Sequence, residues 1–191
     1  GWEKVKLYFM IGFPGETEDD FLKIPGLVKE ILAMAKEILT KDKSRRIRIN
    51  LSINAFCPKP FTHFQWAAQD CEEVLQEKFQ KIVNMLPKKS VNVSWSDPKK
   101  SNLECAMSRW DIKLAGVIEN AFGKGAKFYN WSECFDYSLW EKSFNDCGLD
   151  INFYTEREIM HDELLYWDFI DVGIDKSILL REKMTAKKIL Q

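Results

Sequence analysis

A short glycine-rich segment near the start of the sequence has the residue types of a ligand-binding turn. It reads Gly12-Phe13-Pro14-Gly15-Glu16-Thr17 and directly follows an apolar run. Glycine lets a backbone approach a ligand closely, and the N-terminus of a following helix can receive a phosphate or carboxylate. The same pattern is typical of a tight turn with a helix cap. The sequence therefore predicts either a binding turn or a purely structural one.

A polar stripe and a proline-stiffened loop provide further candidates. Apolar residues at positions 47, 49, 51 and 53 alternate with Asn50, Ser52 and Asn54, which predicts a strand with one apolar and one polar face. The polar face would line a substrate lumen if it is enclosed, or face solvent if the sheet is open. Lys59, between two prolines, could present its charge to an anionic substrate or be an ordinary surface lysine.

Alternating strands and helices would position these residues. The hydrophobic periodicity predicts strands over 5–11, 47–54 and 91–96, and helices over 17–39, 71–86 and 101–122, the first kinked or split at Pro25-Gly26. Strand-helix alternation is typical of α/β folds with parallel sheets, so the three strands should pair in parallel. The nearly unbroken apolar run at 5–11 indicates a strand covered on both faces.

The pattern changes after residue 125. Residues 126–191 are rich in aromatic side chains, and helices are expected over 138–147, 156–166 and from 176 onward. We therefore predict two parts, a βα part over residues 1–125 and a mostly helical C-terminal extension over residues 126–191.

Composition and charge limit the protein class. The chain has 191 residues, 46% of them hydrophobic and 30% charged, with 28 basic against 29 acidic side chains, as in ordinary globular proteins. No apolar run approaches the ~18 residues of a membrane helix, so we expect a cytoplasmic protein with no membrane partner. Five basic residues between Lys41 and Arg48 could meet a nucleic acid, but no aromatic residues interleave them, and solvent-exposed charges are the favoured interpretation.

Three longer motifs resemble a known enzyme family. Residues 8–21, YFMIGFPGETEDDF, resemble the late strand of radical S-adenosylmethionine (radical SAM) enzymes, as found in cobalamin-binding members and methylthiotransferases. Residues 52–66, SINAFCPKPFTHFQW, and 167–174, WDFIDVGI, resemble segments of an uncharacterised subfamily of radical SAM proteins with a B12-binding domain. The resemblance implies an α/β fold, an incomplete (β/α)6 barrel of which residues 1–125 form the C-terminal half.

The resemblance also implies a cofactor site. Its predicted S-adenosylmethionine-binding residues are Met10, Ile11, Gly12, Pro14, Gly15, Glu16, Phe56 and Cys57, the last two through their backbone. Met10 and Ile11 are equally suited to a plain sheet core, and Glu16 could bind a cofactor amine or ribose or cap the helix. The predicted substrate-binding residues are Asn50, Ser52, Asn54 and Lys59.

The motif that holds the iron-sulfur cluster is absent. Radical SAM enzymes bind a [4Fe-4S] cluster through C-x-x-x-C-x-x-C, whereas the five cysteines here are 14, 34, 29 and 13 positions apart, so no metal ligands are predicted. The cluster, and cobalamin in members that use it, would belong to a missing N-terminal portion, the expected partner. No cofactor should bind tightly to this chain alone, and the substrate is unknown.

Two functions follow from these observations. In the first, the chain is part of a radical SAM enzyme whose full-length parent cleaves S-adenosylmethionine to a 5′-deoxyadenosyl radical, and is inactive alone. In the second, it is a non-catalytic RNA- or protein-binding module with a βα core. Departures from the family pattern at Phe61, His63, Cys134 and residues 109–112 point to a changed substrate or lost activity.

Overall fold

The computed structural model describes residues 3–39, 47–129 and 131–189 of the chain. Contacts divide these residues into two units. The first lies within Gly1–Phe56 and Glu72–Asp97, and the second within Cys57–Cys71 and Pro98–Gln191. The sequence-based division after residue 125 remains a prediction, whereas the contacts change unit after Phe56, Cys71 and Asp97. Each unit is described by itself.

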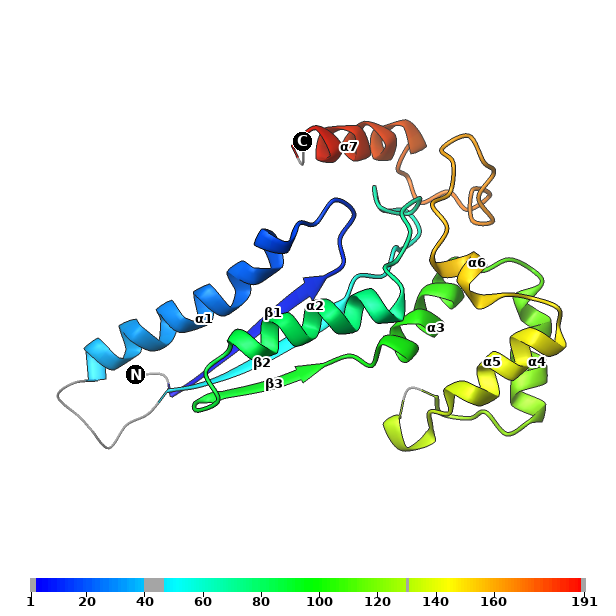
Figure 1. Ribbon diagram of the computed structural model, residues 1–191. Coiled ribbons are helices and arrows are strands. Elements are labelled where there is room, and N and C mark those ends of the chain that lie inside the picture. The colour runs from blue at the N-terminus through cyan, green and yellow to red at the C-terminus, as the bar shows by residue number, and fades with distance from the viewer. Residues whose placement is uncertain (1–2, 40–46, 130, 190–191) are drawn as a thin grey trace. The chain divides into compact units, whose positions relative to one another are not determined.

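A three-stranded parallel sheet forms the centre of the first unit (Figure 1). β1 (Lys4–Ile11), β2 (Arg48–Ala55) and β3 (Val91–Trp95) lie in the order β1-β2-β3. The predicted strands, their parallel pairing and the α/β class are confirmed. The described strands form an open sheet and not a barrel, and β1 and β3 each pair with one neighbour.

Both helices of the first unit cover the same face of the sheet. α1 (Glu18–Ile38) and α2 (Glu72–Met85) pack against each other and share one core with the apolar face of β2, whose Ile49, Leu51 and Ile53 are at most 1% exposed. The opposite face carries no described helix of this unit. The prediction that β1 is covered on both faces was therefore wrong, since Tyr8 is 69% exposed and Met10 44% exposed.

The start of α1 agrees with the sequence, and of the two outcomes predicted at Pro25-Gly26, a kink or a split, the split does not occur. The Asp20 carboxylate accepts hydrogen bonds from the Thr17 backbone N–H, at 3.1 Å, and from the Thr17 hydroxyl, at 2.7 Å, as in a capping box. α1 then runs through Pro25 without a break. Proline removes one helical hydrogen bond, and burial of the Pro25 ring in the core offsets that loss.

The second unit is helical. It contains α3 (Pro98–Ser108), α4 (Leu114–Gly123), the 3-10 helix η2 (Ser132–Cys134), α5 (Tyr137–Asp146), α6 (Ile151–Thr155) and α7 (Lys176–Ile189). The predicted helices over 138–147 and from 176 onward are confirmed. No helix in the described residues is both long and apolar enough to cross a membrane.

The single helix expected over 101–122 is two helices, because a buried aspartate stops and restarts it. Asp111 is 4% exposed and accepts hydrogen bonds from the Lys113 backbone N–H, at 2.8 Å, and from the Tyr154 hydroxyl, at 3.1 Å. Burial and this hydrogen bond raise the pKa of Tyr154. Aspartate side chains that bond nearby backbone N–H groups compete with helix formation, so α3 ends before Asp111 and α4 begins after it.

The helix predicted over 156–166 is absent, and the segment is irregular. Glu163 accepts the Met160 backbone N–H, at 2.7 Å, and forms an ion pair with Arg157, at 2.8 Å. The backbone N–H of Ile159 donates to the carbonyl of Trp66, at 2.8 Å, and is therefore unavailable to a helix. The contacts of Glu163 within the segment and the bond of Ile159 to the distant Trp66 override the local helical pattern.

Candidate functional site

The ends of β1 and β2 lie side by side, as the sequence predicts for parallel neighbours. The Phe56 backbone N–H donates to the carbonyl of Ile11 at 2.7 Å, and the rings of Phe13 and Phe56 are 5.0 Å apart. The carboxyl ends of parallel strands are where α/β proteins bind their ligands. The glycine turn after β1 and the backbone at Phe56 therefore share the edge that is suited to binding.

An internal ion pair holds the glycine turn. Gly12 and Gly15 have φ angles of 87° and 81°, in the region where side chains are disfavoured. The Gly12 N–H donates to Glu16 Oε2 at 2.7 Å, and Lys78 Nζ of α2 donates to the same oxygen at 3.0 Å. Because the side chains of Glu16 and Lys78 are only 8% and 15% exposed, this ion pair is largely shielded from water.

These contacts and the burial of each side chain show where the predicted cofactor-binding residues lie. One oxygen of Glu16 is already used twice, so a structural role explains this residue. The Ile11 side chain is 1% exposed and belongs to the core beneath the helices, whereas Met10 points to the uncovered face of the sheet. Pro14 is half-buried and Gly15 is exposed.

The predicted substrate-binding residues of β2 lie on the uncovered face. The register aligns Lys6, Asn50 and Asn92 in one row across the sheet, and Tyr8, Ser52 and Ser94 in the next. The Asn92 side-chain amide donates to Asn50 Oδ1 at 3.2 Å. Asn54 follows beside Met10. This face is polar on β2 and β3, while β1 adds the exposed Tyr8 and Met10, and it leads to the strand ends that carry the glycine turn.

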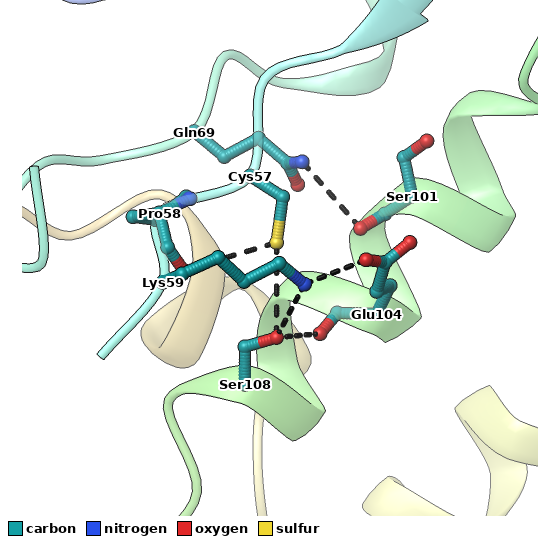
Figure 2. Close-up of polar contacts among 7 residues, drawn as sticks. All are labelled: Cys57, Pro58, Lys59, Gln69, Ser101, Glu104 and Ser108. Carbon is teal, nitrogen blue, oxygen red and sulfur yellow. Dashed lines mark hydrogen bonds and ion pairs between the residues drawn. The ribbon is translucent and has the colours of Figure 1, made fainter. Parts of the chain in front are cut away.

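The other two predicted residues, Cys57 and Lys59, belong to a polar cluster of the second unit (Figure 2). Lys59 Nζ donates to Glu104 Oε1 at 2.6 Å and to Ser108 Oγ at 2.8 Å, and Cys57 Sγ lies 3.9 Å from the same hydroxyl. Ser108 donates in turn to the Glu104 carbonyl at 2.8 Å. Lys59 is thus paired with a carboxylate of its own chain.

The surroundings of Cys57 favour its thiolate. The Cys105 thiol, which hydrogen-bonds the Cys57 sulfur, lowers the pKa of Cys57 to about 7, together with the charge of Lys59 and a hydrogen bond from Ser108, while burial and Glu104 oppose this shift. The pKa of Cys105 is raised by the same hydrogen bond and by burial. Burial is the largest influence on Lys59 and lowers its pKa, but the hydrogen bond and charge of Glu104, together with the Cys57 sulfur, outweigh it, so the pKa of Lys59 is raised.

Sequence reasoning missed several members of both groups. Lys78 lies 62 residues from its partner Glu16, and no local pattern indicates the pairing. Glu104, Cys105 and Ser108 have the spacing of one helix face, but the apolar stripe over 103–122 was assigned to packing. Four of the five basic residues, Lys41 to Arg46, lie outside the described residues, and Arg48 is exposed at the start of β2. Both interpretations, the favoured solvent-exposed charges and the alternative of nucleic-acid binding, therefore stay predictions. The described residues contain no group of three or more side chains suited to a metal ion.

Comparison with known proteins gives one distant relative. A stretch of 119 residues, 62% of the chain, is 30% identical to the uncharacterised protein MJ0966 of Methanocaldococcus jannaschii. The match covers 24% of that protein, so the chain corresponds to about a quarter of this relative. No family model and no solved structure matches the chain.

Proposed function

We propose that the chain is the C-terminal half of the catalytic domain of a radical SAM enzyme. In this proposal the parent protein holds a [4Fe-4S] cluster on polypeptide that precedes the chain. S-adenosylmethionine, bound to that cluster, supplies a 5′-deoxyadenosyl radical, and cobalamin would serve in addition if the parent carries a B12-binding domain. The role of this chain is to provide one wall of the cleft and to position the nucleoside end of the cofactor.

The observation that carries the proposal is the arrangement at the ends of β1 and β2. Two adjacent parallel strands end together, one in a glycine turn and the other in a backbone segment that pairs with it. The two helices that connect the strands, α1 and α2, lie on one face, and the other face carries the polar side chains of β2 and β3. A barrel wall needs this arrangement, because its helices lie outside and its interior must accept side chains or a ligand. A doubly wound sheet instead has helices on both faces.

The residues at this edge are compatible with an adenosyl group. The exposed Met10 side chain and the Phe13 ring provide apolar surface for a flat base. Glycine at positions 12 and 15 keeps side chains away from the turn. Ile11 contributes only backbone there, since its side chain is in the core, and the Glu16-Lys78 ion pair fixes the turn without contacting the ligand.

Asn50, Ser52 and Asn54 would face the substrate in this arrangement. They project from β2 on the polar face, in register with Lys6, Tyr8 and Met10 of β1. Amide and hydroxyl groups orient a polar substrate through hydrogen bonds without carrying charge. Lys59 is in the second unit, where Glu104 neutralises it, and we therefore give it no substrate role.

Binding to the complete parent protein tests the location of the site. The polypeptide encoded by the whole reading frame would be reconstituted with iron and sulfide, and S-adenosylmethionine binding measured by equilibrium dialysis. Met10→Trp, which fills the uncovered face at the strand end, should weaken binding at least tenfold. Met34→Trp is the matched control, because Met34 is 61% exposed on α1, and it should bind normally.

Gly12→Ala should also weaken binding, because a side chain at a φ angle of 87° costs about 1–2 kcal/mol and displaces the turn. If Met10→Trp binds S-adenosylmethionine as tightly as wild type, the proposed site is contradicted. Absence of a C-x-x-x-C-x-x-C segment upstream, together with RNA binding that falls as salt rises, would favour the interaction module instead.

A further inference from the structure

The cluster around Cys57 carries an inference that does not depend on the proposed function. Its members come from two segments of the second unit, the loop at Cys57–Lys59 and the helix α3. Figure 2 shows the Cys57 sulfur and the Lys59 ammonium converging on the Ser108 hydroxyl. Nothing in the proposed chemistry uses the Cys57 sulfur.

Helix geometry explains how three side chains of α3 surround this sulfur. Successive residues of an α-helix are ~100° apart, so Ser108 is about 40° from Glu104 and about 60° from Cys105 around the axis. Ser108 is therefore flanked by a carboxylate on one side and a thiol on the other. Lys59 contacts Glu104 at 2.6 Å, and the Cys57 sulfur lies 3.9 Å from Ser108 Oγ, one helical turn from Cys105 on α3.

The two sulfurs differ in accessibility and charge state. Cys57 is partly exposed, whereas Cys105 is 0% exposed. The neighbours of Cys57 lower its pKa to about 7, which favours its thiolate, while the pKa of Cys105 is raised. An accessible thiolate beside a buried thiol is the arrangement in which one cysteine attacks and the other resolves.

We propose that Cys57 and Cys105 form a redox-active pair, in which Cys57 reacts with small-molecule disulfides and Cys105 closes an intramolecular disulfide. The Cys57 thiolate attacks one sulfur of the reagent, the reagent S–S bond breaks, and the first thiolate leaves with its electron pair. Cys105 then loses its proton and attacks Cys57 Sγ, displacing the second thiolate. Two protein thiols are oxidised, and one disulfide is reduced to two thiols that take up the two protons.

Charged groups on both segments set the pH dependence of the first step. Lys59 favours the Cys57 thiolate and Glu104 disfavours it, while Arg109 acts on the adjacent Cys105. Labelling of Cys57 by iodoacetamide should therefore rise with a midpoint near pH 7, below the ~8.5 of an ordinary thiol such as N-acetylcysteine. Lys59→Met should move this midpoint upward, and Glu104→Gln should move it downward.

The pairing itself is tested with glutathione disulfide and the full 191-residue chain. Peptide mass spectrometry of wild type should show a Cys57–Cys105 link, with a mass lower by two hydrogen atoms. Cys105→Ala should stop at a glutathionyl group on Cys57, and Cys57→Ser should leave Cys105 unmodified. Far-UV circular dichroism confirms that each variant is folded.

Three results would overturn the proposal. The first is a stable glutathionyl adduct on Cys57 of wild type, in the same yield as in Cys105→Ala. The second is a link between Cys57 and a different cysteine. The third is a labelling midpoint for Cys57 that matches N-acetylcysteine and does not respond to Lys59→Met. The last test remains valid even if the cysteine variants fail to fold, because it leaves both cysteines in place.

Discussion

Replacing Lys78 with methionine should destabilise the first unit more than the same change at Lys81. Both lysines lie on α2 and pair with residues at the start of α1. Lys78 contacts Glu16 at 3.0 Å with side chains 15% and 8% exposed, whereas Lys81 contacts Glu18 at 2.8 Å with side chains 39% and 56% exposed. The two substitutions are therefore the same chemical change at sites that differ in burial, and Lys81 also pairs with Glu77 at 3.0 Å.

The magnitudes follow from that burial. Removing one member of a fully buried ion pair costs about 3–5 kcal/mol. Because the pair keeps some solvent contact and Glu16 retains its hydrogen bond from the Gly12 N–H, we expect Lys78→Met to lower the free energy of unfolding by about 2–3 kcal/mol. An exposed pair contributes ~1 kcal/mol or less, so Lys81→Met should change little. A Glu16→Gln, Lys78→Met double-mutant cycle should give a coupling free energy of ~1 kcal/mol or more.

Urea unfolding measures these differences, and hydrogen exchange assigns them to the first unit. Amides of β1 and β2 should lose protection in Lys78→Met, while those of α4 and α5 should not. If Lys78→Met and Lys81→Met differ by less than about 0.5 kcal/mol, within ordinary surface effects, the ion pair does not hold the glycine turn. The structural role given to Glu16 would then be wrong.

Three further predictions concern the surroundings of the site. The pKa of Asp20 is lowered to about 2, mainly by the Thr17 hydroxyl. The ionised Asp20 carboxylate should therefore stabilise the fold fully above about pH 4, and this stabilisation should be lost as the pH falls toward 2. An NMR titration of Thr17→Ala should show a higher pKa for Asp20. In urea unfolding of this chain, Ile53→Ala should lower the free energy of unfolding by about 2–5 kcal/mol, because Ile53 is 0% exposed. Tyr8→Ala should lower it by ~0.5 kcal/mol or less, because Tyr8 is 69% exposed on the opposite face of the sheet. Asp111→Ala removes two hydrogen bonds of a buried carboxylate and should lower the free energy of unfolding by about 2–4 kcal/mol in the same assay. A loss below about 0.5 kcal/mol would contradict the role given to Asp111.

The sequence predicts the first unit well because its signals are local. Alternation at 47–54 fixes which face of β2 is buried, and the capping box at Thr17 fixes the start of α1. The error at β1 has a physical reason. Tyr8 and Met10 are apolar, and a run of apolar residues does not show whether a second layer is present to cover them.

The second unit was harder to predict because distant partners decide it. The break at Asp111 depends on Tyr154, and the irregular segment after α6 depends on Trp66. The cluster at Cys57 likewise needs a helix about fifty residues away, since Cys57 and Ser108 are 51 positions apart. Residue types identified Cys57 and Lys59 as candidates, but only the fold shows that they share a partner.

The formation of 5′-deoxyadenosine tests the central claim most directly. The parent protein, reconstituted with iron and sulfide, would be incubated with S-adenosylmethionine and a strong one-electron reductant, and the products separated by liquid chromatography. The proposal predicts 5′-deoxyadenosine in wild type, a large loss in Met10→Trp, and normal amounts in Met34→Trp. A parent with an intact cluster that forms no 5′-deoxyadenosine, or a Met10→Trp variant as active as wild type, would contradict it.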